Sequence, residues 1–329
     1  MQADYQNTKI FDAIAGAQNI LLLTDERIDG DTTGSTLAMF HWLKSIGKNV
    51  RVFSPKSWPE EYRFLPGAEL VSFDPSIINQ PTDLALIFDC SDGKYLQPFA
   101  LTAPLIVFDH HATNLMYGKV NQVLVEASST GEVVWRFFKA NRIPITRDMA
   151  TCLMMAICTD TTLFTNPSTS QVCMEAAAEL GMAGAKVHDV VKHVYKNKSV
   201  EQLKAWGLAL ERLTELPGKI LITCLLAKDR VAAGVTEIDT SAISNFLIGM
   251  AADAKMIVVF SEKDDGSVKA SMRTLDGDVA AIAKRHGGGG HVKAAGFSVE
   301  QSRLEEGPFG WRVTRADGTY FPIAELLKA

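Results

Sequence analysis

The amino-acid sequence predicts an α/β protein with an N-terminal, doubly wound and mostly parallel sheet and a smaller C-terminal α/β domain. In the first half, short apolar runs alternate with helical patterns, which is typical of parallel strands joined by helices. The runs are continuously apolar, as strands covered on both faces are. After Pro217 and Gly218 the pattern changes, and 329 residues suit two domains of ordinary size. We therefore predict a domain over residues 1–198, a helical connector over 199–216 and a second domain over 217–329.

The predicted elements follow from the spacing of apolar residues. In the first domain the sequence indicates strands over residues 19–24, 49–53, 84–89 and 105–109. Helical spacing predicts helices over residues 34–46, 130–140, 146–159 and 200–213. In the second domain we expect strands over 219–227, 256–261 and 268–273, with helices over 241–254 and 279–286. Methionines at helical positions, Met174 among them, are expected in the core, and the tail over 304–329 is expected to add an edge strand or to cover one.

The composition excludes several classes of protein. Apolar residues make up 47% and charged residues 22% of the chain, which is typical of a soluble globular protein and excludes general disorder. No window reaches the ~18–20 uninterrupted apolar residues of a membrane span, and the first residues lack the pattern of a signal peptide. Five scattered cysteines without a CxxC pair indicate neither a disulfide framework nor a zinc-thiolate site. We expect a cytoplasmic protein without membrane contact.

Three carboxylates lie in the turn after the first predicted strand: Asp25, Asp29 and Asp31. Close together, they would repel one another at neutral pH, and a divalent cation held by oxygen ligands would offset that repulsion. The alternative is an N-capping loop with solvated acids, which is common before helices.

Acidic and imidazole side chains also follow two further strands and one helix. Asp89 ends a very apolar strand, where a carboxylate requires a partner. Asp109, His110 and His111 end the next strand, so one histidine can bind an ion while the other reaches a substrate. Asp160 ends an apolar helix, where a negative charge is unfavourable unless a cation lies nearby. Because ligands of open α/β sheets bind at the carboxyl ends of strands, we expect these groups to meet at one edge.

A glycine run in the second domain predicts an anion site. Gly287 to Gly290 are followed by His291, and consecutive glycines permit positive φ and expose backbone N–H groups. Arg273, at the end of the preceding strand, is a natural second contact to phosphate. The alternative is a flexible linker.

In this order, the motifs resemble the DHH phosphoesterase family with its C-terminal DHHA1 domain. Residues 109–111 correspond to the motif that names the family, and residues 287–296 (GGGGHVKAAG) resemble the substrate-binding signature of DHHA1. The turn that carries Asp29, Asp31, Gly34 and Ser35 matches the first motif of the family. It departs from the family pattern at Asp25, which stands where the family has histidine.

The resemblance implies two divalent cations, Mn²⁺ first and Mg²⁺ as the alternative. It implies that the first cation is held by Asp25, Asp29 and Asp89. It implies that the second is held by Asp31, Asp89, His110 and Asp160, with Asp89 bridging. A pair of cations can lower the pKa of a shared water, and the resulting hydroxide would attack phosphorus in line.

The resemblance also assigns roles to the remaining motif residues. His111 would contact the scissile phosphate, and Asp109 would orient a neighbouring ligand. The rest of the nucleotide would be held by Arg273, Gly288, Gly289, Gly290 and His291.

Family members of this length imply degradation of very short RNAs to 5′-mononucleotides and dephosphorylation of 3′-phosphoadenosine 5′-phosphate (pAp). The net charge of −5 suits short oligoribonucleotides or nucleotides, because long nucleic acids require an extended basic groove. The alternatives are a phosphodiesterase for cyclic di-AMP or a linear signalling dinucleotide, an exopolyphosphatase and a non-catalytic nucleotide-binding relative. Oligomeric state, including a homodimer, is left open by the sequence.

Overall fold

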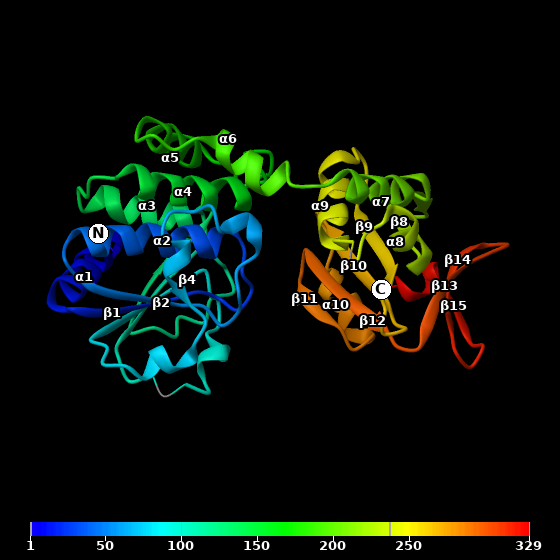
Figure 1. Ribbon diagram of the computed structural model, residues 1–329, viewed down its shortest axis with the longest axis horizontal. Helices are drawn as coiled ribbons and strands as arrows, with labels where there is room; N and C mark the ends of the chain where they lie inside the picture. Colours follow the sequence, from blue (N-terminus) through cyan, green and yellow to red (C-terminus); the bar gives the residue numbers. More distant parts are fainter. Residues whose placement is uncertain (1, 100, 237, 329) are drawn as a thin grey trace. The chain divides into compact units, whose positions relative to one another are not determined.

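The structure is a computed structural model that describes residues 2–99, 101–236 and 238–328 (Figure 1). It divides into two compact units, Met1–Asn197 and Lys198–Ala329. Each unit has its own sheet and its own apolar core. None of the helices in the described part of the chain combines the length and the apolar composition that a membrane crossing requires.

The first unit is built on a six-stranded sheet in which every pairing is parallel. Its strands are β1 (Asn19–Leu23), β2 (Asn49–Phe53), β3 (Val71–Ser72), β4 (Leu84–Phe88), β5 (Leu105–Asp109) and β6 (Val120–Val123). Their order is β3-β2-β1-β4-β5-β6, so the direction of winding reverses between β1 and β4. The predicted doubly wound parallel sheet is therefore confirmed. The crevice at such a reversal is where ligands bind in sheets of this kind.

Helices cover one face of this sheet (Figure 1). They are α1 (Gln2–Gly16), α2 (Gly30–Ser45), α3 (Thr130–Ala140), α4 (Arg147–Asp160), α5 (Gln171–Met182) and α6 (Val187–Val190), followed by the π-helical turn η5 (Val191–Tyr195). Helix α2 begins four residues before the predicted start, because the Asp29 side chain accepts the N–H groups of Asp31 and Thr32 and caps the helix there. Met174 on α5 is exposed, so its predicted place in the core is wrong.

The opposite face of the sheet is covered by short 3₁₀ turns and loops. These turns include η3 (Pro75–Asn79) and η4 (Lys94–Leu96), and η1 (Glu60–Tyr62) and η2 (Ala68–Leu70) precede them in the chain. Leu21, Leu23 and Ile87 of the sheet pack there against Ile78 and Leu96. Both faces are therefore buried, which explains why the strands are continuously apolar.

Helix α4 approaches the N-terminal turns of α2 and α3 very closely, at three glycines. A Cβ atom at Gly34 would lie 2.3 Å from the carbonyl oxygen of Cys152, and one at Gly131 would lie 2.4 Å from Cβ of Ala156. At Gly30 a Cβ atom would lie 2.4 Å from the hydroxyl of Thr159. No larger residue fits at these positions without moving α4, so the glycines determine where α4 ends.

The second unit contains a mixed six-stranded sheet with the order β11-β12-β10-β9-β8-β7. Its strands are β7 (Thr214–Leu216), β8 (Ile220–Leu225), β9 (Met256–Glu262), β10 (Val268–Thr274), β11 (Gly289–His291) and β12 (Ala294–Val299). Only the pairing of β8 with β9 is parallel among those in the described part of this sheet. Its helices are α7 (Val200–Glu211), α8 (Ala227–Ala233), α9 (Thr240–Met250) and α10 (Val279–Arg285). A smaller α/β unit therefore follows the first one, as predicted.

Two parts of the second unit differ from expectation. The predicted connector over residues 199–216 belongs to this unit, because Ala205 and Ala209 on α7 are fully buried in its core. The tail forms a separate antiparallel sheet of β13 (Ser302–Gly307), β14 (Gly310–Arg315) and β15 (Tyr320–Pro322), followed by α11 (Ile323–Leu326), rather than a single edge strand. Val313 of β14 and Ile323 are buried against the main sheet, which explains why this tail folds back.

Candidate metal centre and active site

The candidate site lies at the carboxyl ends of three neighbouring parallel strands of the first unit. Asp25 follows β1, Asp89 directly follows β4, and Asp109 is the last residue of β5. Helix α2 begins in the same region with Asp31 in its first turn. The sheet thus brings residues far apart in sequence to the point where its winding reverses.

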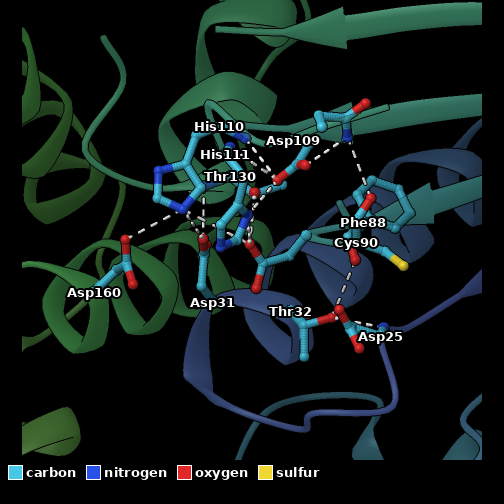
Figure 2. A network of polar contacts seen from close by, with 12 residues as sticks. Asp25, Asp31, Thr32, Phe88, Cys90, Asp109, His110, His111, Thr130 and Asp160 are labelled. Atoms are coloured by element: carbon cyan, nitrogen blue, oxygen red, sulfur yellow. Dashed lines mark hydrogen bonds and ion pairs between the residues drawn. The ribbon is translucent and has the colours of Figure 1, made fainter. Parts of the chain in front are cut away.

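Three carboxylates lie around His110, and Figure 2 shows two of them, Asp31 and Asp160. Its Nε2 atom lies 3.8 Å from Asp31, 3.8 Å from Asp89 and 3.5 Å from Asp160. Nδ1 of the same ring lies 3.3 Å from the carbonyl oxygen of Ala127, which can only accept a hydrogen bond. Nδ1 therefore donates to this carbonyl oxygen, which leaves Nε2 on the side of the three carboxylates, where it could bind a cation.

We call Asp31, Asp89, His110 and Asp160 the His110 set. Candidate ligand atoms of Asp31, His110 and Asp160 lie within 4.8 Å of one another, and so do those of Asp89, His110 and His111. One imidazole nitrogen and several carboxylate oxygens suit a divalent cation such as Mn²⁺, Mg²⁺ or Zn²⁺. The donor chemistry of the His110 set therefore fits the second cation that the resemblance implies.

Asp31 is fixed in place by the N-terminus of α3. Its carboxylate accepts hydrogen bonds from the backbone N–H groups of Thr130 at 2.6 Å and Gly131 at 2.8 Å, and from the hydroxyl of Ser35 at 3.2 Å. The hydroxyl of Thr130 also donates to Asp89 at 3.1 Å. The free N–H groups and the dipole at a helix N-terminus stabilise a carboxylate there. From the sequence, residues 129–132 resemble the helix start of the family, but Thr130 was not expected to contact the ligands.

Burial and mutual repulsion make these carboxylates hard to ionise. Burial raises the pKa of Asp31, and it raises the pKa of Asp89 and Asp160 well above the usual value, with repulsion from neighbouring carboxylates adding to it. Desolvation of its carboxylate by the surrounding protein, together with the charge of Asp31, raises the pKa of Asp29 to about 6, although part of the Asp29 surface is exposed to solvent. A divalent cation would offset this repulsion and favour the ionised forms.

Asp89 also adopts an unusual backbone conformation. Its φ is 60°, in the left-handed region that residues other than glycine seldom occupy. Thr162, Leu163 and Phe164, just after Asp160, have positive φ values as well. Such conformations cost on the order of 1–3 kcal/mol each and cluster at functional sites. The strain therefore falls on the two chain segments that supply Asp89 and Asp160.

His111 is held mainly by Asp109, although its Nδ1 atom also lies 3.6 Å from Asp89 of the His110 set. Its Nδ1 atom lies 2.7 Å from Oδ1 of Asp109, and the side-chain amide of Asn114 donates to the other oxygen at 2.6 Å. Although burial opposes ionisation of Asp109, these hydrogen bonds keep its pKa below the usual value. The hydrogen bond to Asp109 in turn raises the pKa of His111. Asn114 was not identified from the sequence, since nothing in its neighbours marks it.

Asp25 and Asp29 fall outside both ligand groups, although the charge of Asp29 acts on Asp89 and Asp160. Asp25 is buried and binds Arg27, whose Nη2 lies 2.8 Å from Oδ2 and whose backbone N–H donates to Oδ1 at 3.0 Å. Oδ1 of Asp29 accepts the N–H groups of Asp31 and Thr32 and so caps α2. This is the N-capping role that was the alternative to a metal site in this turn. Within residues 2–99, 101–236 and 238–328, no group of three candidate ligands includes either residue. In Figure 2, Asp25 lies beside Thr32 at the end of the network remote from Asp160. The implied first-cation set is therefore not assembled.

In the second unit, Arg273 is fixed near the end of β10. Its Nε donates to the side-chain oxygen of Asn245 on α9 at 2.6 Å, and Nη1 donates to the carbonyl oxygen of Met272 at 2.9 Å. Asn245 was not identified from the sequence. The two hydrogen bonds hold the guanidinium in one orientation, which favours recognition of a planar or tetrahedral anion.

The glycine run has a structural role that differs from the predicted exposed N–H groups. Gly287 and Gly288 donate their N–H groups to carbonyl oxygens at the end of α10, and Gly289 and Gly290 begin β11. A Cβ atom at Gly288 would lie 2.2 Å from the carbonyl oxygen of Gly296, so glycine is needed for β12 to pass this closely. The side chain of His291 lies outside the described part of the structure.

Comparison with known proteins identifies the class of protein that this fold and site define, a phosphoric ester hydrolase. Residues 19–157 match the N-terminal domain of the DHH family, and residues 218–307 match the DHHA1 domain. The chain belongs to the DHH family, as its motifs predicted.

Three relatives illustrate the family. The chain is 28% identical over 291 residues to the bifunctional oligoribonuclease and PAP phosphatase NrnA of Thermus thermophilus, covering 87% of this chain and 86% of that protein. It is 30% identical over 201 residues to a probable manganese-dependent inorganic pyrophosphatase of Lactobacillus delbrueckii, covering 58% and 62%. The crystal structure of an exopolyphosphatase-related protein from Bacteroides fragilis superimposes with a TM-score of 0.81 at 22% identity, covering 89% and 90%. This last likeness supports the fold alone.

Proposed function

We propose that this enzyme degrades very short oligoribonucleotides to 5′-mononucleotides and converts pAp to AMP. The observation that carries the proposal is the convergence of the His110 set beside His111, at the reversal point of the parallel sheet. The relative of Thermus thermophilus, whose name states both activities, aligns over 87% of the chain. The formal net charge of −5 favours a short substrate over a long one.

The His110 set would hold a divalent cation, for which we propose Mn²⁺ with Mg²⁺ as the alternative. A cation there would polarise a phosphoryl oxygen and make water a better nucleophile. The mixed imidazole and carboxylate donors are compatible with Mn²⁺. The Lactobacillus relative that is named as manganese-dependent supports the same choice.

The residues around the cation ligands would bind and orient the phosphate. His111 is held by Asp109 through Nδ1, so its Nε2 is the nitrogen that would donate a hydrogen bond to a phosphoryl oxygen. The raised pKa of His111 favours the protonated ring that such a donor requires. Asp109 is then a positioning residue, because it acts through His111 rather than on the substrate.

For the second unit, we propose that it binds the nucleotide portion of the substrate. Arg273, oriented by Asn245, would contact phosphate. Gly288, Gly289 and Gly290 would allow the substrate to approach the backbone of β11, and His291 follows them in the chain. This assignment rests on the match to the DHHA1 domain and on the fixed guanidinium.

The decisive experiment is a substrate panel. Purified full-length protein would be incubated with pApA, pGpG, a pentaribonucleotide, pAp, cyclic di-AMP and polyphosphate, each with Mn²⁺ and with Mg²⁺, and products separated by chromatography. We expect 5′-mononucleotides from the linear RNAs and AMP from pAp, with Mn²⁺ the better cation. The variant His110→Ala is the control and is expected to lose activity on every substrate.

Other outcomes would overturn the proposal in identifiable ways. Turnover of cyclic di-AMP alone would indicate a signalling phosphodiesterase. Phosphate release from polyphosphate without cleavage of any nucleotide would indicate an exopolyphosphatase. Binding of pApA without cleavage under all conditions would indicate a non-catalytic nucleotide-binding protein.

A further inference from the structure

The ion pair between Asp25 and Arg27 engages a carboxylate that the resemblance assigned to the first cation. Asp25 has only 3% of its surface exposed, and it is neutralised from within its own turn. Nη2 of Arg27 lies 2.8 Å from one carboxylate oxygen, while the backbone N–H and Nε of Arg27 lie 3.0 and 3.5 Å from the other. Both oxygens of Asp25 therefore already have a positively charged or polar partner from Arg27.

Arg27 also acts on the residues that surround the proposed phosphate position. Its pKa is raised mainly by its hydrogen bond to Asp25, and Asp89 adds to this through its charge. Its positive charge in turn opposes protonation of His111. The side chain keeps 47% of its surface exposed, so a ligand can reach the guanidinium even while Asp25 is buried beneath it. Arg27 thus carries a positive charge that interacts electrostatically with both Asp89 and His111.

We infer that this chain holds one resident divalent cation, at the His110 set, and that the guanidinium of Arg27 takes the place of a second. The inference rests on the proposed phosphoryl substrate. A guanidinium matches the geometry of phosphate oxygens and remains charged at any working pH. Arg27 would then neutralise phosphoryl oxygens on the side of the site opposite Asp160, and it is a catalytic residue that no sequence motif marks.

The competing arrangement is that a second cation displaces Arg27. Asp25 would then turn both oxygens from the guanidinium to the cation, and the N-cap Asp29 would have to supply a further ligand. That arrangement leaves Arg27 without its carboxylate partner. The two arrangements differ in the number of cations that the protein binds, which can be measured without any substrate.

The test is a Mn²⁺ titration of the full chain at neutral pH, read by isothermal calorimetry and by electron paramagnetic resonance of free Mn²⁺. The proteins compared are wild type, Arg27→Met, Arg27→Lys and the control Arg63→Met, which removes an exposed arginine of the same unit. We expect one tightly bound Mn²⁺ in all four proteins. We expect kcat on pApA to fall at least ~100-fold in Arg27→Met, the loss typical of removing one preorganised charge-stabilising donor, and less in Arg27→Lys.

Two results would overturn the inference: two tightly bound Mn²⁺ ions in wild type, or kcat of Arg27→Met within about threefold of wild type, well short of that expected loss. Thermal melts show whether each variant is folded. If Arg27→Met is unfolded, the Mn²⁺ titrations of wild type and Arg27→Lys still give the number of bound cations. A protein that binds one Mn²⁺ but cleaves no nucleotide would contradict the proposed function and leave the cation count standing. A protein that binds two Mn²⁺ ions and cleaves pApA would contradict the inferred cation count and leave the proposed function standing.

Discussion

Nδ1 of His111 lies 2.7 Å from Oδ1 of Asp109, and the Asp109 side chain is fully buried. The contact joins the first and third residues of one motif, and it keeps the imidazole in a single orientation. The pKa of His111 is raised and that of Asp109 is lowered by this same hydrogen bond. The pair therefore favours a protonated imidazole at the end of β5.

The first prediction concerns the pH dependence that this pair creates. Asp109→Asn removes the carboxylate that raises the pKa of His111, so protonated His111 is lost at lower pH. The basic limb of the kcat profile on pApA should move to lower pH, and kcat near pH 8 should fall about 10- to 100-fold. The control Asp92→Asn alters a carboxylate that pairs with Lys94 and should leave the profile in place. An unshifted basic limb in Asp109→Asn would contradict the assigned role.

A second prediction separates the two roles of Asp31. Asp31→Asn lacks the charge and keeps only one of the two oxygens that accept from the N-terminus of α3, so Mn²⁺ affinity should fall about 100-fold while part of the capping contribution to stability is retained. Asp31→Ala also leaves the N–H groups of Thr130 and Gly131 without their partner, which costs about 1–3 kcal/mol in the free energy of unfolding. Calorimetric Mn²⁺ titrations and urea denaturation measure the two effects. Equal stability of both variants would show that the capping contact is unimportant.

The third prediction follows from the raised pKa values of Asp29, Asp31, Asp89 and Asp160. Above the unfolded pKa of about 3.9, the unfolded chain releases protons that the folded state retains, so the free energy of unfolding falls as pH rises. For Asp29 this loss is spread up to its folded pKa of about 6.

Cation-free protein should therefore melt at a lower temperature at about pH 7 than at about pH 5. A bound cation removes the repulsion and competes with protons, so Mn²⁺ should raise Tm more at the higher pH. Scanning calorimetry in the presence of a chelator or of Mn²⁺ measures both. A Mn²⁺-induced shift that is equal at the two pH values would refute this account.

A fourth prediction tests the second unit. Arg273→Ala removes the guanidinium that Asn245 orients, so KM for pApA should rise about tenfold while kcat changes much less. Lys269→Ala, on the same strand, is the matched control and should leave both constants near wild type. A loss confined to kcat would instead place Arg273 close to the reacting phosphate.

The fold and the residues of the His110 set were accessible from sequence for identifiable reasons. Continuous apolar strands ending in Asp89 and Asp109 indicate a parallel sheet with polar groups at one edge, and the structure brings Asp31, Asp160 and His110 to that edge. Asp25 was different, because its partner Arg27 is a neighbour in the same turn. Motif spacing indicates which residues lie near one another. It does not show whether Asp25 binds a cation or the guanidinium of Arg27.

The fifth prediction concerns the close approach of α4 to α2. Gly34→Ala places a Cβ atom 2.3 Å from a carbonyl oxygen, so α4 must shift, at a cost of about 1–3 kcal/mol. The shift displaces Asp160, and activity should fall by more than tenfold. Gly181→Ala is the control, since nothing lies near that position, and it should stabilise the protein by up to about 1 kcal/mol. Wild-type activity in Gly34→Ala would show that the position of α4 is not critical.

The same glycine contacts bear on ion selectivity. The separation between Asp31 and Asp160 depends on close helix contacts, with a backbone carbonyl oxygen at Gly34 and with Cβ of Ala156 at Gly131. An aperture of fixed width discriminates by ionic radius, since ligand distances run from about 2.0–2.1 Å for Mg²⁺ to about 2.3–2.6 Å for Ca²⁺. If the His110 set holds a cation, its ion preference should therefore depend on Gly34 and Gly131, which are not ligands, and changing that preference would begin with the spacing between the helices.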